Sequence, residues 1–374
     1  MLTVLADDIT GAAEIAGVCL RFGLRVAFDL DFNIQRLPET DVWVIASDTR
    51  SLPEKEACDV VKTIACRLKE LQVKILFKKI DSVLRGYIIP EIKVLQKYFP
   101  FDRIFILPAN PETGRIIRNG IYYINEMPLN QTFFANDPDF PAKTASIREI
   151  LQLTEENEKY ITPNISNKRD YEKYARQISP QTLPVGGSVF FESCLPVYFP
   201  AAKSCDIIIQ PIRKRNSMLM ISGSTHEASK RFIRENQIFK PIEIDANWVI
   251  ELLKDSENFQ IWIENVISIF NQWKKIIITV KNECDRLVSS EKVKKLLAAI
   301  TAELICKCTI DELFIEGGAT ARACLRAADF TSLIPVEEYT RGVVRFKIPG
   351  KKSMHLTIKP GSYAWPEKLF EITL

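Results

Sequence analysis

Several motifs that define common protein classes are missing from this 374-residue sequence. It contains neither G-x-x-x-x-G-K-[ST] nor G-x-G-x-x-G, which argues against a P-loop ATPase and a standard dinucleotide-binding fold. No apolar run reaches the length of about 18 residues that a membrane span needs. Of the two histidines, His226 and His355, neither lies in a pattern with Ser or Cys that would predict a hydrolase triad.

An excess of one charge is also missing. The chain has 50 basic and 47 acidic residues and a net charge of +3, so we expect no nucleic-acid partner, which would need a clustered basic excess. The nine cysteines are odd in number and no secretory segment precedes them, which favours reduced thiols in the cytoplasm. Cys306-Lys307-Cys308 lacks a second pair and nearby histidines, so we interpret it as a buried helix end and expect no protein metal site.

The first half of the chain alternates short apolar runs with helical segments. Each run ends in polar or charged residues, a pattern typical of a parallel, doubly wound α/β sheet whose strand ends meet at one edge. The predicted strands are Val4–Ala6, Val42–Ala46, Ile75–Phe77 and Ile104–Leu107, and the helices between them include Lys55–Leu71 and Ile88–Tyr98.

Charged residues follow these strands. Asp7 and Asp8 are adjacent at the end of the first strand, where two carboxylates are costly to desolvate unless they bind something. Because Arg and Lys bind a carboxylate or phosphate while Asp accepts hydrogen bonds from hydroxyl groups, such an edge suits a small, polyhydroxylated, anionic ligand. The residues expected at this edge are Asp7, Asp8, Asp48, Arg50, Lys79, Asp81, Arg85 and Arg115.

A second domain is predicted after a linker rich in proline and basic residues over 196–216, which divides the chain into domains 1–205 and 206–374. Its predicted strands are Met218–Ser222, Ile276–Val280, Glu312–Ile315 and Met354–Ile358. Three of them lead into glycine turns, at Gly223-Ser224, Gly317–Thr320 and Gly361-Ser362. Glycine lets the backbone approach a phosphate and helix N-termini offer amide donors, so the turns favour nucleotide binding, although glycine also simply ends strands.

These motifs resemble one known family. The stretches Ala6–Ala12, Lys79–Gly86 and Pro108–Pro111, followed by Gly114-Arg115 and the C-terminal glycine turns, are similar to the four-carbon acid sugar kinase family, which includes D-threonate kinase and 3-oxo-tetronate kinase. The resemblance runs nearly end to end. It implies an N-terminal acid-sugar-binding domain and a C-terminal nucleotide-binding domain, each with a largely parallel sheet flanked by helices, and an active site in the cleft between them.

The resemblance also implies a reaction: transfer of a phosphoryl group from ATP, with Mg²⁺, to a hydroxyl of a threonate-like or 3-oxo-tetronate-like acid. It assigns the sugar acid to Asp7, Asp8, Thr10, Lys79, Asp81, Ser82, Arg85 and Arg115. It assigns ATP to Ser224, Gly317, Gly318, Ala319, Thr320 and Gly361. Catalytic roles fall to Asp8, Asp81 and Arg85, and either Asp8 or Asp81 is the base. A homodimer is a guess from the frequency of symmetric assemblies.

The sequence departs from the family on the nucleotide side. Ser229 and Phe232 stand where the family usually has Thr and Gln, the final turn (361–364) ends in Ala instead of Gly, and the chain is shorter than usual. A second hypothesis is therefore a non-catalytic sugar-acid-binding or regulatory protein with a degenerate nucleotide site. A third is that the charged strand-end residues form ion pairs that only brace the sheet edge.

Overall fold

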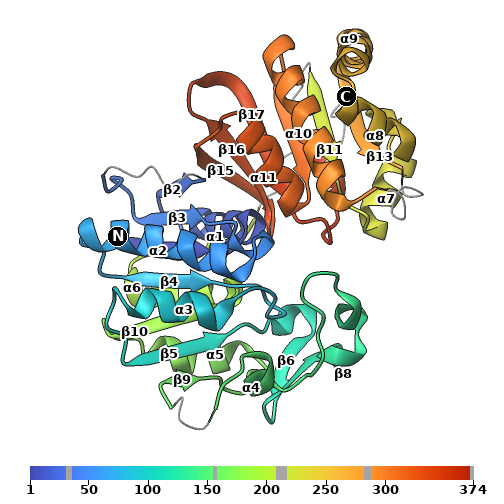
Figure 1. Ribbon diagram of the computed structural model, residues 1–374. Coiled ribbons are helices and arrows are strands. Elements are labelled where there is room, and N and C mark those ends of the chain that lie inside the picture. Colours follow the sequence, from blue (N-terminus) through green and yellow to red (C-terminus); the bar gives the residue numbers. More distant parts are fainter. Residues whose placement is uncertain (31–35, 155–157, 208–216, 282–287, 371–374) are drawn as a thin grey trace. The chain divides into compact units, whose positions relative to one another are not determined.

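The structure is a computed structural model that describes residues 1–30, 36–154, 158–207, 217–281 and 288–370. The chain forms two compact units, Met1–Cys205 and Asp206–Leu374, which are described separately (Figure 1). Part of the predicted linker, residues 208–216, lies outside the described residues.

The first unit is built on a parallel sheet with the strand order β2-β3-β1-β4-β10-β5-β9. The central strands are buried on both faces, as expected where helices cover a parallel sheet. The predicted α/β architecture is confirmed. The strands are β1 (Leu2–Ala6), β2 (Val26–Asp29), β3 (Val42–Ala46), β4 (Leu76–Lys79), β5 (Arg103–Leu107), β9 (Tyr160–Ile161) and β10 (Thr182–Gly186).

The helices of the first unit pack in two groups, α2 with α3 and α1 with α6 and α5 (Figure 1). Helix α1 begins at Ile9 because the Asp8 carboxylate accepts the backbone N–H of Gly11. A small antiparallel sheet of β6 (Arg115–Arg118), β7 (Ile121–Ile124) and β8 (Met127–Pro128) follows β5 along the chain. The helices are α1 (Ile9–Arg21), α2 (Glu54–Glu70), α3 (Ile88–Gln96), α4 (Ile147–Ile150), α5 (Lys168–Ala175) and α6 (Ser188–Tyr198).

The sheet of the second unit has the order β12-β13-β11-β14-β17-β16-β15. The first five strands are parallel, and β17, β16 and β15 form an antiparallel meander. Four of these strands were predicted from the sequence, whereas β12, β15 and β16 were not. The strands are β11 (Met218–Ser222), β12 (Lys240–Ile244), β13 (Lys275–Val280), β14 (Glu312–Glu316), β15 (Ser332–Thr340), β16 (Val343–Ile348) and β17 (Lys351–Lys359).

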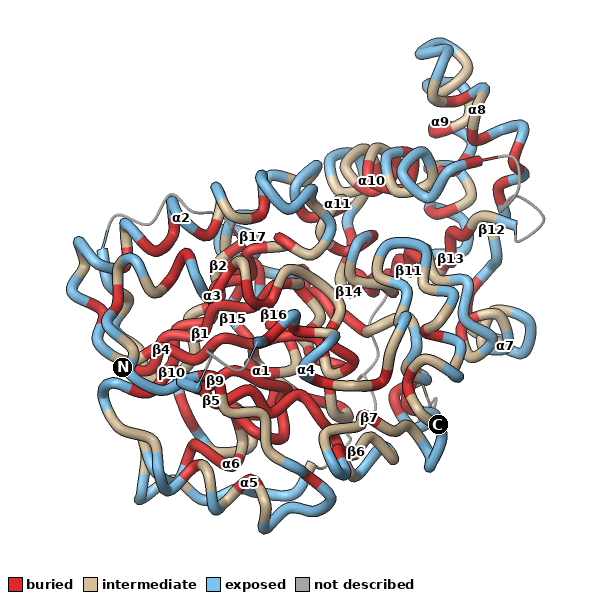
Figure 2. The backbone as a smooth tube through the Cα atoms, turned by 60° about the horizontal axis from the view of Figure 1, so that its bottom comes forward, coloured by how far each residue is buried: buried red, intermediate tan, exposed pale blue. Residues whose placement is uncertain are grey.

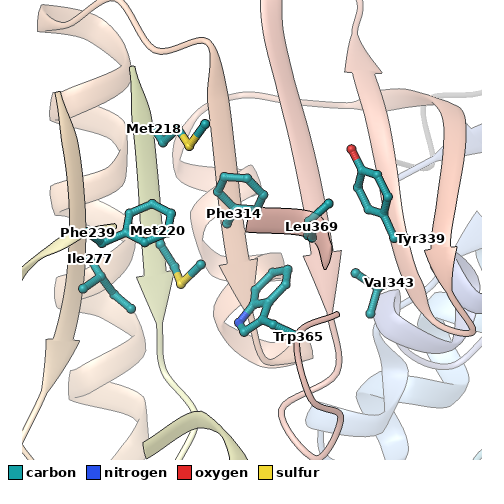
Figure 3. Packing of buried hydrophobic residues seen from close by; sticks show 9 residues of the cluster. All are labelled: Met218, Met220, Phe239, Ile277, Phe314, Tyr339, Val343, Trp365 and Leu369. Carbon is teal, nitrogen blue, oxygen red and sulfur yellow. The ribbon is translucent and has the colours of Figure 1, made fainter. Parts of the chain in front are cut away.

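An aromatic-rich core fills one face of this second sheet. Phe314 of β14 packs edge-on against Trp365 and Phe239, with ring centroids 5.7 and 6.2 Å away (Figure 3). Burial follows the strands, whereas exposed residues gather on the outer turns of the helices (Figure 2). The helices are α7 (Glu227–Glu235), α8 (Ala246–Lys254), α9 (Ser256–Trp273), α10 (Ser290–Lys307) and α11 (Gly318–Ala327).

One expectation about this unit is wrong. The helix end at Cys306 and Cys308 is not buried: Cys306 is exposed and Cys308 is half-buried. The reason is helical geometry, because Cys306 lies two residues beyond the buried Leu304 and so about 200° around the helix, on the solvent side. Across the described residues, no helix combines the length and apolar character needed to cross a membrane.

Candidate functional site

The carboxyl ends of five parallel strands align in the first unit. Pairing places Ala46, Ala6, Lys79, Gly186 and Leu107 in one row, the last row of β3, β1, β4, β10 and β5. The residues that follow each strand therefore share one edge, as the sequence predicted. Lys79 is the charged member of the row and is only 4% exposed.

Arg50 is the centre of the charge cluster at this edge. Its guanidinium donates to both carboxylate oxygens of Asp7, at 2.8 and 2.9 Å. It also donates to Asp8 at 3.0 Å and lies 3.5 Å from Asp81. One half-buried cation thus holds three carboxylates that come from two strand ends.

Asp81 is held from its other side by Arg85. The Arg85 guanidinium donates to both Asp81 oxygens, at 2.9 and 3.0 Å, and to Asp137 at 3.3 Å. The Asp81 carboxylate also accepts the backbone N–H groups of Val83 and Arg85. The loop after β4 is thereby folded around its own carboxylate, and Asp137 ties it to the segment that follows β8.

Arg115 and Ser82 meet at the same edge. Arg115 donates from its guanidinium to the Ser82 hydroxyl, and the buried Tyr122 hydroxyl donates to the Ser82 backbone carbonyl. Lys79 donates to the carbonyl of Ile80 at 3.0 Å. Among the described residues, Lys79 and Arg115 have no carboxylate within ion-pair distance, unlike Arg50 and Arg85.

The charge environment keeps Asp8 and Asp81 ionised, whereas burial raises the pKa of Asp7 despite the neighbouring charge of Arg50. Burial alone would raise the pKa of Asp81, but the charges of Arg50 and Arg85 outweigh it and hold the pKa well below its usual range. The pKa of Asp8 is lowered in the same way: burial opposes ionisation, and Arg50, Lys79 and a 2.5 Å hydrogen bond from Thr10 overcome it. At neutral pH both groups are therefore hydrogen-bond acceptors.

The structure brings together at this edge the sugar-acid residues named from the sequence. Asp48, which the sequence also places at the edge, has a left-handed backbone (φ 53°), and its carboxylate accepts a hydrogen bond from the Ser51 hydroxyl. From the sequence, Arg50 was expected at this edge without a specific role, and no role was predicted for Asp137 or Tyr122. The signal for Arg50 was its place just after a strand, but nothing in the sequence pairs it with three carboxylates.

In the second unit, three neighbouring parallel strands also end in register. Ser222, Glu316 and Lys359 are direct cross-strand neighbours in the last row of β11, β14 and β17. Each is followed at once by one of the predicted turns. All six residues assigned to the nucleotide therefore lie along one edge of this sheet.

Close contacts join the three turns. A Cβ on Gly223 would lie 2.0 Å from the Thr320 hydroxyl, so only glycine fits there. Gly317 has a φ of +96°, which glycine alone adopts without strain, and it starts α11 without any side-chain cap on the first amides. The Ser224 hydroxyl donates to the Gly361 carbonyl at 3.2 Å.

This edge suits a nucleotide better than it suits a metal held by the protein alone. The first turn of α11 contains Gly318 and Ala319, and its amides have no side-chain cap. The partial positive charge of these amides favours an anion at the helix N-terminus. Within the described ranges, no group of three or more His, Cys, Asp or Glu side chains could hold a metal ion.

Two family models match the chain. A sugar-binding N-terminal domain matches residues 2–182, and a nucleotide-binding C-terminal domain matches residues 219–363, so that together they account for most of the sequence. Each matched range falls within one compact unit.

Curated relatives are kinases. A D-threonate kinase of Salmonella typhimurium is 24% identical over 370 residues, covering 86% of this chain and 85% of that protein. A D-threonate kinase of Bordetella bronchiseptica is 31% identical over 154 residues, covering 40% of this chain and 38% of that protein. A 3-oxo-tetronate kinase of Cupriavidus necator is 30% identical over 168 residues, 42% of this chain and 38% of that protein. The two shorter alignments span well under half of those relatives.

Solved structures share the fold along the whole chain. A Salmonella typhimurium protein superposes with a TM-score of 0.80 at 18% identity, covering 99% of this chain and 97% of its own. A Haemophilus influenzae protein superposes with a TM-score of 0.72 at 19% identity, covering 99% and 98%. At this level of identity the likeness establishes the fold.

Proposed function

Because the chain belongs to the four-carbon acid sugar kinase family, we propose that it transfers the γ-phosphoryl group of ATP to a hydroxyl group of a threonate-like or 3-oxo-tetronate-like acid. The acceptor binds at the charged edge of the first unit and the nucleotide at the glycine turns of the second. The observation that carries the proposal is the division of the cations at the charged edge. Arg50 and Arg85 are ion-paired with the protein's own carboxylates, whereas Lys79 and Arg115 have no carboxylate within ion-pair distance among the described residues and are the proposed contacts for a ligand.

The proposed anchors for the ligand carboxylate are Arg115 and Lys79. A guanidinium carries five N–H donors, and Arg115 uses one on Ser82, so the others remain for a ligand. Lys79 is buried with its ammonium bound to one backbone carbonyl. Arg50 and Arg85 are each already bound to both oxygens of an aspartate, and we assign them to positioning.

Asp8 is the proposed acceptor for the attacking hydroxyl. Its side chain is 15% exposed, against 4% for Asp7 and 9% for Asp81, so it is the most accessible of the three carboxylates. A carboxylate that stays ionised at neutral pH can orient the hydroxyl and receive its proton as the phosphoryl group is transferred. Asp81, bound by two arginines, is then a positioning residue.

On the donor side, the proposed phosphate contacts are backbone amides of the turns, together with the Ser224 and Thr320 hydroxyls. Positive charge in this enzyme class neutralises the transferring group, and a nucleotide-bound Mg²⁺ would supply part of it. The residues of the chain contribute by holding the phosphates in place and excluding water around them.

The test is ADP release by the purified chain with Mg-ATP against a panel of four-carbon sugar acids of each configuration. We expect turnover with one or a few acids. The variant R115A should lose most of its affinity for the acid, whereas R118A, on the same strand but 53% exposed and paired with Glu126, should behave like wild type. Thermal stabilisation by an acid without ADP release would refute phosphoryl transfer and leave the binding-protein hypothesis.

A further inference from the structure

Beneath the glycine turns of the second unit lies a buried charge pair. Glu316 and Lys359 form an ion pair, and their side chains are 1% and 0% exposed. Ser222, the next residue in the same cross-strand row, donates its hydroxyl to Glu316 at 2.6 Å. Two charges removed from water gain little net stability from their attraction, so such a pair calls for another explanation.

The pair binds the backbone of the last turn. The Lys359 ammonium donates to the carbonyl of Pro360 at 2.9 Å and to the carbonyl of Tyr363. The Ser229 hydroxyl lies 2.7 Å from Glu316 and 3.2 Å from the Gly361 carbonyl, which also accepts from Ser224. Three carbonyls of the turn, those of Pro360, Gly361 and Tyr363, therefore accept hydrogen bonds from the network.

The orientation of these three carbonyls also fixes the direction of the N–H groups that follow them. The peptide groups are planar and trans, so the N–H that follows each carbonyl points the opposite way. The three N–H groups concerned belong to Gly361, Ser362 and Ala364, and among the described residues they have no hydrogen-bond partner. The amides of Gly361 and Ser362 are consecutive, and consecutive amides directed to one side form the kind of concavity that binds phosphate.

We propose that Lys359, Glu316 and Ser229 are positioning residues that turn the amides of Gly361, Ser362 and Ala364 toward a phosphate group of the nucleotide. This rests on the proposed function and adds to it a phosphate subsite and the side chains that build it. The proposal also accounts for the missing final glycine. No residue of the turn 360–364 has a positive φ, so Ala364 supplies the same amide that a glycine would.

A substitution at Ser229 tests the positioning role with the smallest change to the buried network. The variant S229A removes one hydroxyl from the network, and S229T restores it with the residue that the family usually has there. The matched control is S193A, because Ser193 is also buried and donates only to the Val189 carbonyl within α6. A paired variant, E316Q/K359M, removes both charges at once and so leaves no buried charge without a partner.

The measurements are calorimetric titration of the full-length protein with Mg-ATP, and steady-state kinetics in which ATP and the sugar acid are varied separately. We expect S229A to weaken nucleotide binding and raise the KM for ATP about 3- to 10-fold, the value of one hydrogen bond, with the KM for the acid unchanged. S229T and S193A should bind like wild type. E316Q/K359M should lose nucleotide binding while an acid still raises its melting temperature.

The outcomes separate the two proposals. If wild type binds and uses ATP but S229A and E316Q/K359M bind it within twofold of wild type, the positioning role is wrong and the proposed function stands. Equal rises in both KM values would mean a general structural defect and would also overturn the role. If wild type binds no nucleotide, the proposed function fails and the phosphate subsite fails with it.

Discussion

Replacing Arg50 by alanine should destabilise the first unit strongly. The Arg50 side chain is 16% exposed, and its guanidinium holds both oxygens of Asp7 and reaches Asp8 and Asp81. Without it, Asp81 keeps Arg85 and Asp8 keeps its hydrogen bonds from Thr10 and Gly11, but Asp7 has no cation within ion-pair distance among the described residues. The loss is therefore dominated by one buried carboxylate left without its partner.

Removing one partner of a buried ion pair costs about 3–5 kcal/mol, because the other charge stays buried. For a unit of this size, that corresponds to a fall in melting temperature on the order of 10 °C. The matched control is R25A, which breaks an ion pair with Asp41 of similar length (3.0 Å) at an arginine that is 71% exposed. Solvent screens that pair, so its loss should be far smaller.

The pH dependence makes this prediction sharper. In wild type, the pKa values of Asp8 and Asp81 are lowered, so their stabilisation is complete above the ordinary value of 3.8 and is lost as the pH falls through the lowered values. The pKa of Asp7 is already raised in wild type, because burial outweighs the charge of Arg50. R50A removes that charge and raises the pKa of Asp7 further, so the added penalty is present at high pH and is relieved as the pH falls through the raised value. The difference between the two proteins should shrink from about pH 8 to about pH 5.

Thermal unfolding followed by circular dichroism at both pH values is the assay. Two results would refute the reasoning: a loss at about pH 8 no larger than that of R25A, or a large loss that does not change with pH. The first would mean that the cluster is solvated, and the second that Arg50 stabilises the fold by packing alone.

Three further predictions concern the acceptor edge and the two cores. A methyl group on Gly11 would lie 2.7 Å from the Lys79 ammonium and would displace it. G11A should therefore raise the KM for the acid roughly 10- to 100-fold without changing the KM for ATP. An unchanged KM for the acid would contradict this prediction. Lys78 and Glu91 form a buried ion pair 2.6 Å apart. K78M should lower the free energy of unfolding, measured in urea, by about 3–5 kcal/mol, because Glu91 becomes an unpaired buried charge. The double variant K78M/E91L should recover most of this loss. W365A should lower the free energy of unfolding of the second unit by about 3–5 kcal/mol, because it leaves a cavity in the aromatic core. A urea midpoint that corresponds to a loss below about 1 kcal/mol would contradict this and show that the core closes around the cavity.

The strands and their polar ends could be predicted from the sequence because both signals are local. Val42–Ala46 is an apolar run that ends at Ser47 and Asp48, and the structure places β3 on those five residues. The strands that were missed carry weaker local signals. β12 is mostly exposed and contains Pro241, and β15 contains Pro335 beside a β-bulge, so neither has the continuous apolar run of a central parallel strand.

The partners at each edge could not be predicted, because they depend on strand order. Arg50 meets Asp7 and Asp81 since β1 lies between β3 and β4, an arrangement that brings Arg50 to residues 43 and 31 positions away in the sequence. The row of Ser222, Glu316 and Lys359 arises in the same way from β14 lying between β11 and β17. Sequence patterns identify which residues end a strand, and pairing decides which of them touch.

The two edges use the last row of a parallel sheet in opposite ways. At the first, the proposed ligand groups are the side chains of Lys79 and Arg115, so recognition would depend on side-chain chemistry that a substitution removes. At the second, the Lys359 ammonium binds backbone carbonyls, and the proposed ligand groups are backbone amides, which every residue except proline carries. This difference explains why departures from the family at the final turn are compatible with a working phosphate site. Changes there alter side chains and keep the donors, provided that the buried pair beneath them is intact.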